Sequence, residues 1–297
     1  MLFHSGVFDL VFNQPLNRDR KLQSFCRFLR WQIGSRLLQT DIVFDWVNGA
    51  KFRVRQGETG LTGNIYAGLH EFPDMAFLLH FLRKEDVFAD VGSNSGSYTI
   101  LAGSSIGAKV YAFEPVPRTY ARLVENVRIN HAEDWVTCIN KGVGAKKGML
   151  RFTGGNDTTN HALAEGETAV DTVNVELVPL DDEFAIVAPN LMKIDVEGFE
   201  TLVIKGAQRI LRDSALRCVI MELNGSGARY GFDETDILRS MENFGFKTYT
   251  YDPFQRTLIP INGKNTFSGN TLFIREETFV VERVKMAPKI SLFGKQF

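Results

Sequence analysis

The feature that most constrains this chain is an alternation of strand-like and helix-like segments from about residue 70 onward. Short apolar runs of strand length are separated by longer segments whose apolar residues recur at helical spacing. This alternation predicts βαβ units with right-handed crossovers, and hence a largely parallel sheet with helices on both faces. The expected strands are VFADV (87–91), KVYAFE (109–114), WVTCIN (135–140), NLMKID (190–195), RCVIMEL (217–223), KTYTY (247–251) and NTLFIRE (270–276). The expected helices run from Pro73 to about Leu82 and over 97–106, 118–130 and 201–213, and residues 233–246 are expected to form a helix and a turn.

The chain outside this region divides into two further segments. We expect an N-terminal helical and β-hairpin extension over 1–69, the main domain over 70–276 and a C-terminal tail over 277–297. In the extension, DIVFDWV and AKFRVRQ flank Asn48-Gly49, a dipeptide that tolerates positive φ at both positions and so predicts a hairpin. A polar stretch over 154–172 is expected to form a loop or insertion between strands.

Residues 17–38 predict a helix with an apolar stripe, and arginines and a lysine fill much of its remaining surface. The preferred interpretation is that the stripe packs on the main domain and the basic face is solvated. The alternative is a helix that lies on a membrane surface near a lipid-linked acceptor. The apolar residues of the stripe are Leu22, Phe25, Leu29, Ile33 and Leu37.

Composition excludes several classes of protein. The 34 basic and 35 acidic residues give a net charge of −1, so the chain as a whole has no electrostatic attraction to nucleic acid. No uncharged apolar run approaches the roughly 18 residues of a spanning helix, and the first residues lack a basic leader. We therefore expect a cytoplasmic protein whose three widely spaced cysteines are buried free thiols.

The first motif with chemical content is DVGSNSGS at residues 90–97, directly after the first strand of the main domain. Ligands of such sheets bind beyond the carboxyl ends of the strands, where glycines let the backbone turn and a helix begins. A dinucleotide site favours three glycines and no acid, because a carboxylate such as that of Asp90 repels pyrophosphate. The same carboxylate attracts an ammonium group, which S-adenosylmethionine carries. An ordinary turn between strand and helix is the alternative.

The second motif is FEP at residues 113–115, which ends the next strand. An acid about 20 residues past the glycines accepts hydrogen bonds from both ribose hydroxyls of a nucleoside. Dinucleotide enzymes use the same arrangement, so Glu114 indicates a nucleoside without saying which one. A solvated glutamate at the end of a strand is the alternative.

The third motif is KIDVEGFE at residues 193–200. Asp195 and Glu197 follow a strand apolar enough to be buried, at the same edge of the sheet as the other two motifs. A helix N-cap and a glutamate in a first helical turn would give the same pattern, and both are common.

Together, DVGSNSG, FEP and KIDVEGFE resemble the FkbM family of class I methyltransferases, over about 71–274. The resemblance implies a Rossmann-like, mostly parallel seven-stranded sheet, S-adenosylmethionine as cofactor and O-methylation of sugars or of polyketide- or glycan-derived molecules. It also implies that Asp195 and Glu197 lie beside the reacting centre. Ser93 and Ser95 are more polar than is usual there. The cofactor-binding residues expected on these grounds are Glu71, Asp90, Gly92, Ser93, Asn94, Gly96, Ser97, Tyr98, Glu114, Pro115 and Asp195.

Methylation of an alcohol is helped about 10²–10⁴-fold by a positioned base. The candidate catalytic residues are Asp195, Glu197 and His161, with His70 as a further possible base. Asp195 is preferred, because a helix start is expected to stabilise the anion of Glu197 and lower its basicity.

The sequence leaves open whether a metal takes part. Asp195, Glu222 and Asn224 fall at neighbouring strand ends, and oxygen ligands of this kind hold Mg²⁺, which would orient the acceptor hydroxyl.

Three rival functions compete with an O-methyltransferase that has a small-molecule or glycan acceptor. A nicotinamide oxidoreductase lacks support because the third glycine is missing and Asp90 is present. A nucleic-acid methyltransferase would carry an N/D-P-P-aromatic segment where this chain reads DVEG. A non-catalytic binding module would be favoured by loss of Asp90 or Glu114, and both are present. Acceptor specificity is expected to reside in the N-terminal extension and in residues 154–170.

Overall fold

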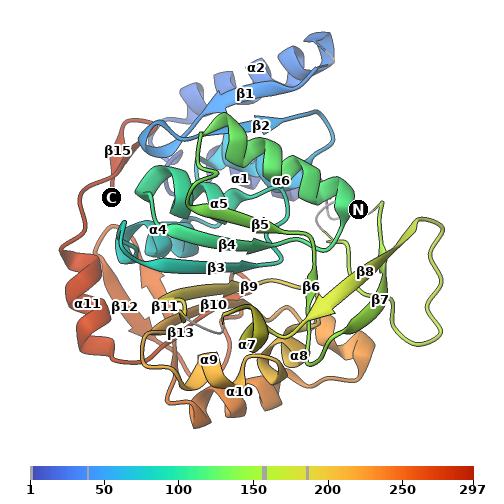
Figure 1. The fold of residues 1–297 in the computed structure, drawn as a ribbon. Helices are drawn as coiled ribbons and strands as arrows, with labels where there is room; N and C mark the ends of the chain where they lie inside the picture. Colours follow the sequence, from blue (N-terminus) through green and yellow to red (C-terminus); the bar gives the residue numbers. More distant parts are fainter. Residues whose placement is uncertain (1–2, 39, 156–158, 185–186) are drawn as a thin grey trace.

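The computed structural model describes residues 3–38, 40–155, 159–184 and 187–297, and an eight-stranded sheet organises it (Figure 1). Five neighbouring strands of the sheet are parallel to one another. The strand at one end of this group, which lies in the middle of the sheet, pairs with an antiparallel neighbour. The strand order is β12-β11-β13-β10-β9-β3-β4-β5. The strands are β3 (Val87–Val91), β4 (Lys109–Phe113), β5 (Val136–Ile139), β9 (Leu191–Ile194), β10 (Cys218–Glu222), β11 (Lys247–Asp252), β12 (Thr257–Pro260) and β13 (Asn270–Ile274).

The predicted α/β class with a Rossmann-like, mostly parallel sheet is confirmed, and the seven expected strands are all present. The eighth, β12, was not predicted. It pairs antiparallel with β11 at the edge of the sheet and is largely exposed, so it has no buried apolar run to reveal it.

Central strands are buried on both faces because helices cover both. In β10, Cys218 and Ile220 belong to one hydrophobic cluster, whereas Val219 and Met221 belong to the other, as the two-residue period of a strand requires. The first cluster includes side chains of α4 (Phe72–Phe81), α5 (Ser97–Ile100), α6 (Pro117–Ile129) and α11 (Glu277–Lys285). The second includes side chains of α7 (Leu180–Glu183), α8 (Glu200–Lys205), α9 (Gln208–Arg212) and α10 (Glu234–Asn243).

The single helix expected over 201–213 is wrong, because the structure has two short helices, α8 and α9. The break falls at Gly206, where a Cβ atom would lie 2.1 Å from the carbonyl oxygen of Gly144. Two backbone segments meet too closely there for any side chain. The expected helix over 97–106 is present as α5 followed by a π-helical stretch, Leu101–Ile106.

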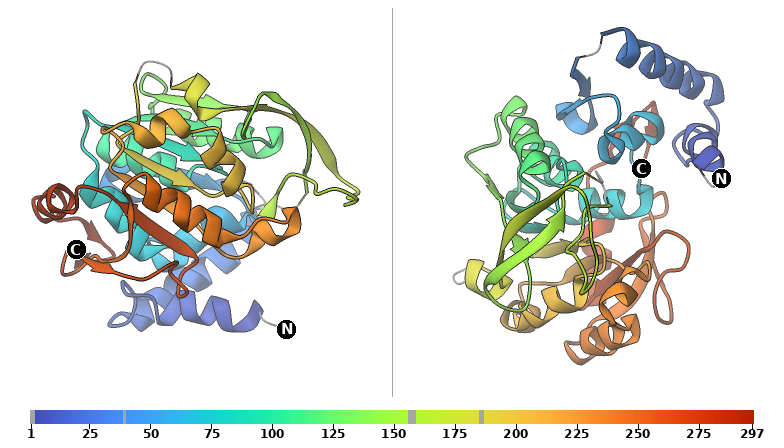
Figure 2. Two further views of the ribbon diagram at one scale, coloured as in Figure 1. Left: turned by 90° about the horizontal axis from the view of Figure 1, so that it is seen from below. Right: turned by 90° about the vertical axis from the view of Figure 1, so that its right-hand side faces the viewer.

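A small second sheet stands beside the carboxyl end of the main one (Figure 2). It contains β6 (Gly142–Val143), β7 (Gly148–Thr153) and β8 (Thr172–Val178), in the order β6-β8-β7. The predicted polar insertion is the connection between β7 and β8, and its residues 156–158 lie outside those that the structure describes.

The N-terminal extension contains the predicted hairpin and helix. The hairpin pairs β1 (Ile42–Asp45) with β2 (Lys51–Val54), and its turn has φ of 52° at Asn48 and 82° at Gly49. The predicted helix is α2 (Lys21–Leu38), and it is accompanied by α1 (Phe3–Phe12) and α3 (Thr59–Ala67), which were not predicted.

The preferred interpretation of how α2 docks is wrong. The side chains that α2 buries are Ser24, Trp31 and Ser35, whereas the apolar stripe from Leu22 to Leu37 is exposed. The expectation of three buried thiols fails on the same helix, because Cys26 is exposed.

The C-terminal segment, for which no structure was predicted, forms α11, β14 (Ser291–Leu292) and β15 (Lys295–Gln296). The division at 69/70 and 276/277 stays a prediction. No helix among the described residues is long and apolar enough to cross a membrane.

Candidate functional site

A cavity of about 320 Å³ opens at the carboxyl ends of β3, β4, β9 and β10, where the sequence placed the site. Six acidic side chains and two lysines line it. Of the predicted site residues, those that line the cavity are Glu71, Asp90, Gly92, Ser93, Asn94, Ser97, Tyr98, Glu114, Pro115, Asp195 and Glu197. Gly96 and His161 do not.

The two glycines of the loop after β3 have structural roles. Gly92 has φ of +83°, and a Cβ atom there would lie 1.7 Å from the carbonyl oxygen of Asp195. Gly96 precedes α5 with φ of +98°, and a Cβ atom there would lie 2.8 Å from Leu123. Gly92 is therefore required by a backbone-to-backbone contact between the first and third motifs.

Asp90 is the penultimate residue of β3 and is 1% exposed. The Thr99 hydroxyl donates to Oδ2 at 2.6 Å, but Oδ1 is buried and has no hydrogen-bond partner among the described residues. Burial raises the pKa of Asp90 to about 6, although the ammonium group of Lys193 opposes the shift. A buried carboxylate oxygen without a donor is costly unless a ligand supplies one.

Glu114 follows β4, and each of its carboxylate oxygens accepts one backbone N–H. Asn94 donates to Oε2 at 3.0 Å and Val116 donates to Oε1 at 2.9 Å. Burial raises the pKa of Glu114 to about 7. Each oxygen keeps a second lone pair, so the carboxylate is fixed in place and still able to accept from a ligand.

Several other predicted cofactor residues use their side chains within the protein. Ser93 Oγ lies 3.2 Å from the Phe113 carbonyl, which explains a polar residue at that position. Ser97 Oγ donates to the Gly60 carbonyl at 3.3 Å and accepts from Asn64 at 3.2 Å. These contacts hold the loop against β4 and α3.

Glu71 precedes α4 and joins a buried polar network. The Tyr98 hydroxyl donates to its Oε2 at 2.8 Å, and Asn270 donates to its Oε1 at 2.7 Å. Beside it, burial raises the pKa of Asp74 to about 8, and the charge of Glu71 adds to the shift.

Lys193 is the residue that sequence reasoning missed. It lies on β9 and is 3% exposed, with Nζ 2.5 Å from Asp195 Oδ2 and 4.7 Å from the centre of the Tyr98 ring. The nearby charges of Asp195, Glu71 and Asp90 raise its pKa against the effect of burial. A lysine inside an otherwise apolar strand is the signal that would have identified it, because a buried cation needs acidic partners.

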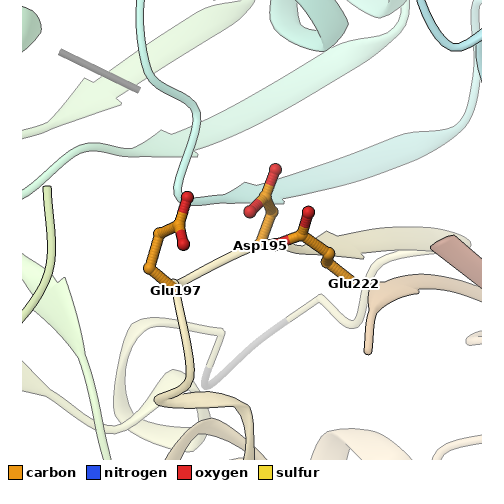
Figure 3. Close-up of side chains that lie close together, drawn as sticks. All are labelled: Asp195, Glu197 and Glu222. Atoms are coloured by element: carbon orange, nitrogen blue, oxygen red, sulfur yellow. The ribbon is translucent and has the colours of Figure 1, made fainter. Parts of the chain in front are cut away.

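Three carboxylates converge beyond the ends of β9 and β10 (Figure 3). One oxygen each of Asp195, Glu197 and Glu222 lies within 4.8 Å of the others. Burial and the charge of Asp195 raise the pKa of Glu222 to about 9 and that of Glu197 above its ordinary value. Glu222 Oε2 is buried and has no hydrogen-bond partner in the described part of the chain.

The expected helix start at Glu197 is wrong. Helix α8 begins at Glu200, and Glu197 lies in the preceding turn with φ of +54°. Burial and a neighbouring acid raise its pKa, contrary to the predicted lowering by a helix terminus. The turn is instead held by Glu200, whose Oε1 accepts from the N–H groups of Val196 and Gly198, both at 3.2 Å.

His161 and Asn224 do not line the cavity. The ring nitrogens of His161 lie 2.9 Å from the Thr159 carbonyl and 2.9 Å from Glu167 Oε1, so both already have partners. Asn224 Oδ1 accepts from the N–H of Ser226 at 2.9 Å, and Glu197 takes the place beside Asp195 and Glu222 that Asn224 was expected to fill. His70 does line the cavity.

Comparisons with known proteins agree with these motifs. A family model described as the methyltransferase FkbM domain matches residues 90–248, more than half of the chain. The hexuronic acid methyltransferase AglP of Haloferax volcanii is 29% identical over 174 residues, which cover 58% of this chain and 67% of that protein. The 31-O-demethyl-FK506 methyltransferase FkbM of Streptomyces tacrolimicus is 30% identical over 171 residues, covering 46% of this chain and 66% of that protein.

Among solved structures, a methyltransferase FkbM from Methylobacillus flagellatus aligns with a TM-score of 0.44 at 16% identity. The alignment covers 74% of this chain and 56% of that one, so this chain spans little more than half of that relative. On the match of the family model, the chain belongs to the FkbM family of methyltransferases.

Proposed function

We propose that this methyltransferase uses S-adenosylmethionine to methylate a hydroxyl oxygen of a sugar, a glycan or a related small molecule. The observation that carries the proposal is the unpartnered, buried Oδ1 of Asp90 in a cavity lined by six acids and only two lysines. Such a site favours a ligand with positive charge and N–H donors.

S-adenosylmethionine fits these residues and, when bound, supplies a methyl group already activated by the positive charge on sulfur. Asp90 would accept from the ammonium group, and Glu114 would accept from the ribose hydroxyls through its remaining lone pairs. The same acidic lining opposes a pyrophosphate, which argues against a nicotinamide cofactor.

Transfer to a hydroxyl forms an oxygen–carbon bond as the carbon–sulfur bond breaks, and the hydroxyl proton must go to a base. Asp195 is the proposed base on its position, since the helix start expected to disfavour Glu197 is absent: Asp195 is 29% exposed at the cavity, and the Lys193 ammonium holds its Oδ2 in a fixed position. Lys193 is then a positioning residue. Glu197 and Glu222, whose pKa values are raised, would supply further acceptor oxygens for the substrate hydroxyl when ionised and donors when protonated.

The acceptor class rests on the relatives. One is a hexuronic acid methyltransferase and another carries a 31-O-demethyl substrate in its name. A sugar or another polyhydroxylated molecule would meet oxygen acceptors from Asp195, Glu197 and Glu222 and a cation from Lys141, all of which line the cavity.

Calorimetric titration with S-adenosylhomocysteine tests the cofactor. Asp90→Asn keeps the acceptor for Thr99 and removes the charge, so affinity is expected to fall about 10–100-fold, as loss of a charged hydrogen bond implies. Glu133→Ala, an exposed acid outside the cavity, is the matched control and should bind like the wild type. Binding of NADH without binding of S-adenosylhomocysteine would overturn the proposal.

Incubation with S-adenosylmethionine and candidate glycans, including hexuronate-containing ones, tests the reaction. Mass spectrometry should show one added methyl group on the acceptor. Its linkage should resist acid and base, as an ether does. A methyl ester on an acceptor carboxylate instead of an ether would contradict the proposed hydroxyl chemistry.

A further inference from the structure

The exposed apolar stripe of α2, defined by Leu22, Phe25, Leu29, Ile33 and Leu37, has no counterpart in the proposed reaction. The exposed fractions are 76% for Leu22, 56% for Ile33 and 76% for Leu37. Spacings of three and four residues place all five side chains on one face of the helix, over almost its full length. Both views of Figure 2 show α1 and α2, in blue, at the periphery of the molecule.

The neighbouring helix extends this surface. Phe8 of α1 is 65% exposed, and its ring centre lies 6.0 Å from that of Phe12, which in turn lies 6.1 Å from that of Phe25. The stripe of α2 and Phe8 therefore form one surface, which we call the α1–α2 apolar face. A continuous apolar face of this kind marks a site of interaction, whereas isolated exposed apolar residues do not.

The opposite side of α2 is fixed to the protein by polar contacts. Ser24 Oγ donates to the Val11 carbonyl at 2.5 Å, and Gln32 donates to the Tyr66 hydroxyl at 2.7 Å. Arg27 donates to Asn17 Oδ1 at 2.6 Å, and its guanidinium lies 3.5 Å from the centre of the Phe293 ring. Rotation of the helix to bury its apolar stripe would break all of these contacts, so the exposure is built into the fold.

Charge identifies the kind of partner. Residues 3–40, which include both helices, contain six arginines and lysines against two aspartates, Asp9 and Asp19, and α2 itself contains no acid. Lys21 and Arg30 are exposed beside the apolar stripe, and the described residues give neither of them an ion pair. An exposed apolar helix face bordered by cations is the arrangement that lies in the interface of an anionic bilayer.

We propose that the α1–α2 apolar face docks on a membrane surface rich in anionic lipid, with Phe8 and the stripe of α2 inserted at the level of the headgroups. Long cationic side chains such as Lys21 and Arg30 reach from the edge of the helix to lipid phosphates. A second copy of the chain is a poorer occupant. Two-fold pairing through α2 would oppose the cations of one helix to those of the other, with no acid in residues 20–40 to balance them.

The face is connected to the cavity through one element. Helix α3 packs against both α1 and α2, and Gly60, in its first turn, lines the cavity. Docking would thus hold the cavity close to the membrane. The docking itself does not depend on the identity of the methyl acceptor.

Co-sedimentation with vesicles tests the proposal. The full chain should sediment with phosphatidylcholine vesicles that contain about one third phosphatidylglycerol, and should bind vesicles of phosphatidylcholine alone at least about tenfold more weakly. Leu29→Glu with Ile33→Glu should weaken binding to the anionic vesicles at least about tenfold. Lys21→Gln with Arg30→Gln should weaken it about 25-fold, at about fivefold for each cation removed.

Phe267→Glu is the matched control, because Phe267 is 98% exposed outside the α1–α2 apolar face, and it should bind like the wild type. The substituted side chains are exposed, so each variant should melt at the wild-type temperature.

Cys26 gives a second measurement. It is exposed on α2, whereas burial raises the pKa of Cys138 to about 11 and that of the buried Cys218 well above its ordinary value, so a thiol-reactive, polarity-sensitive dye labels Cys26.

The emission of the dye at Cys26 should shift to the blue on addition of anionic vesicles and return on addition of high salt. Failure to bind either kind of vesicle, or equal binding to both, would overturn the proposal. So would a stable dimer, measured by light scattering, that Leu29→Glu with Ile33→Glu converts to a monomer.

Discussion

Replacement of Lys193 by methionine removes the cation at the centre of the acidic cavity and keeps most of the side-chain volume. Lys193 is 3% exposed and its Nζ lies 2.5 Å from Asp195 Oδ2. Loss of one partner of a buried ion pair costs about 3–5 kcal/mol, because the other charge stays buried and uncompensated. Asp195 is 29% exposed and regains some hydration, so we expect the low end, about 3 kcal/mol.

This change in the free energy of unfolding should lower the melting temperature by roughly 6 °C, the low end of the range for a chain of this size. The assay is thermal and denaturant unfolding followed by circular dichroism, which needs no substrate. Lys147→Met is the matched control. Its ion pair with Asp182 is largely exposed, so its loss should cost less than about 1 kcal/mol.

The dependence on pH tests the cause. Burial already raises the pKa of Asp90 to about 6, and loss of the Lys193 ammonium raises it further. A carboxyl with a folded pKa above its unfolded pKa stabilises the fold fully only below the unfolded value, and that contribution is lost as pH rises through the folded value. The deficit of Lys193→Met should therefore be largest at alkaline pH and shrink as pH falls towards about 6, below which Asp90 is protonated in both proteins.

Asp90→Asn in the Lys193→Met background should recover part of the lost stability, since it removes one of the uncompensated charges. A deficit that is equal at all pH values, with no recovery in the double variant, would refute the idea that Lys193 balances these carboxylates. It would indicate a loss of packing alone.

Three further outcomes follow from the site. Asp195→Asn should lower turnover about 10²-fold or more in single-turnover kinetics, with affinity for S-adenosylhomocysteine within a few-fold of the wild type. His161→Ala should keep the native rate, and the reverse pattern would move the base into the polar insertion. Gly92→Ala should unfold at lower denaturant than the wild type, because its Cβ atom would lie 1.7 Å from a carbonyl oxygen, whereas Gly148→Ala, with nothing within 4 Å, should melt normally. EDTA should leave turnover unchanged, as should Asn224→Ala; activity lost with EDTA and restored by Mg²⁺ would show that the three carboxylates hold a metal.

Much of the fold was predictable because the central strands are buried on both faces. Their apolar runs are distinct in the sequence, and the polar residues that follow them mark the edge of the sheet where a ligand binds. Asp90, Glu114 and Asp195 were found in this way, and the structure brings all three to one cavity. A residue next to the end of a parallel strand has its position fixed by the sheet itself.

Other features depend on contacts between distant segments. The break between α8 and α9 is caused by the carbonyl of Gly144, about 60 residues away, so the local helical pattern of 201–213 carries no trace of it. The apolar stripe of α2 was recognised correctly as a stripe, but periodicity shows which residues share a face and not which face is buried. On α2 the buried face includes Ser24, whose hydroxyl donates to the Val11 carbonyl, a contact that only the folded chain provides.

The three motifs that the sequence shows separately form one bonded unit in the structure, and this determines which substitutions are informative. The N–H groups of Gly92 and Ser93 donate to the Phe113 carbonyl at 3.0 and 2.9 Å, and Asp195 donates to the Val91 carbonyl at 2.9 Å. Loss of Glu114 or of the glycine would disturb the loop as well as any ligand, so a loss of affinity there has two causes. A loss of affinity in Asp90→Asn would have a single cause. The Oδ2 atom keeps the acceptor for Thr99, and the unpartnered Oδ1 holds no protein contact that the amide would break. A neutral amide is also cheaper to bury than a carboxylate, so stability should be kept or increased while binding of S-adenosylhomocysteine falls. That combination separates a ligand-binding role of Asp90 from a structural one.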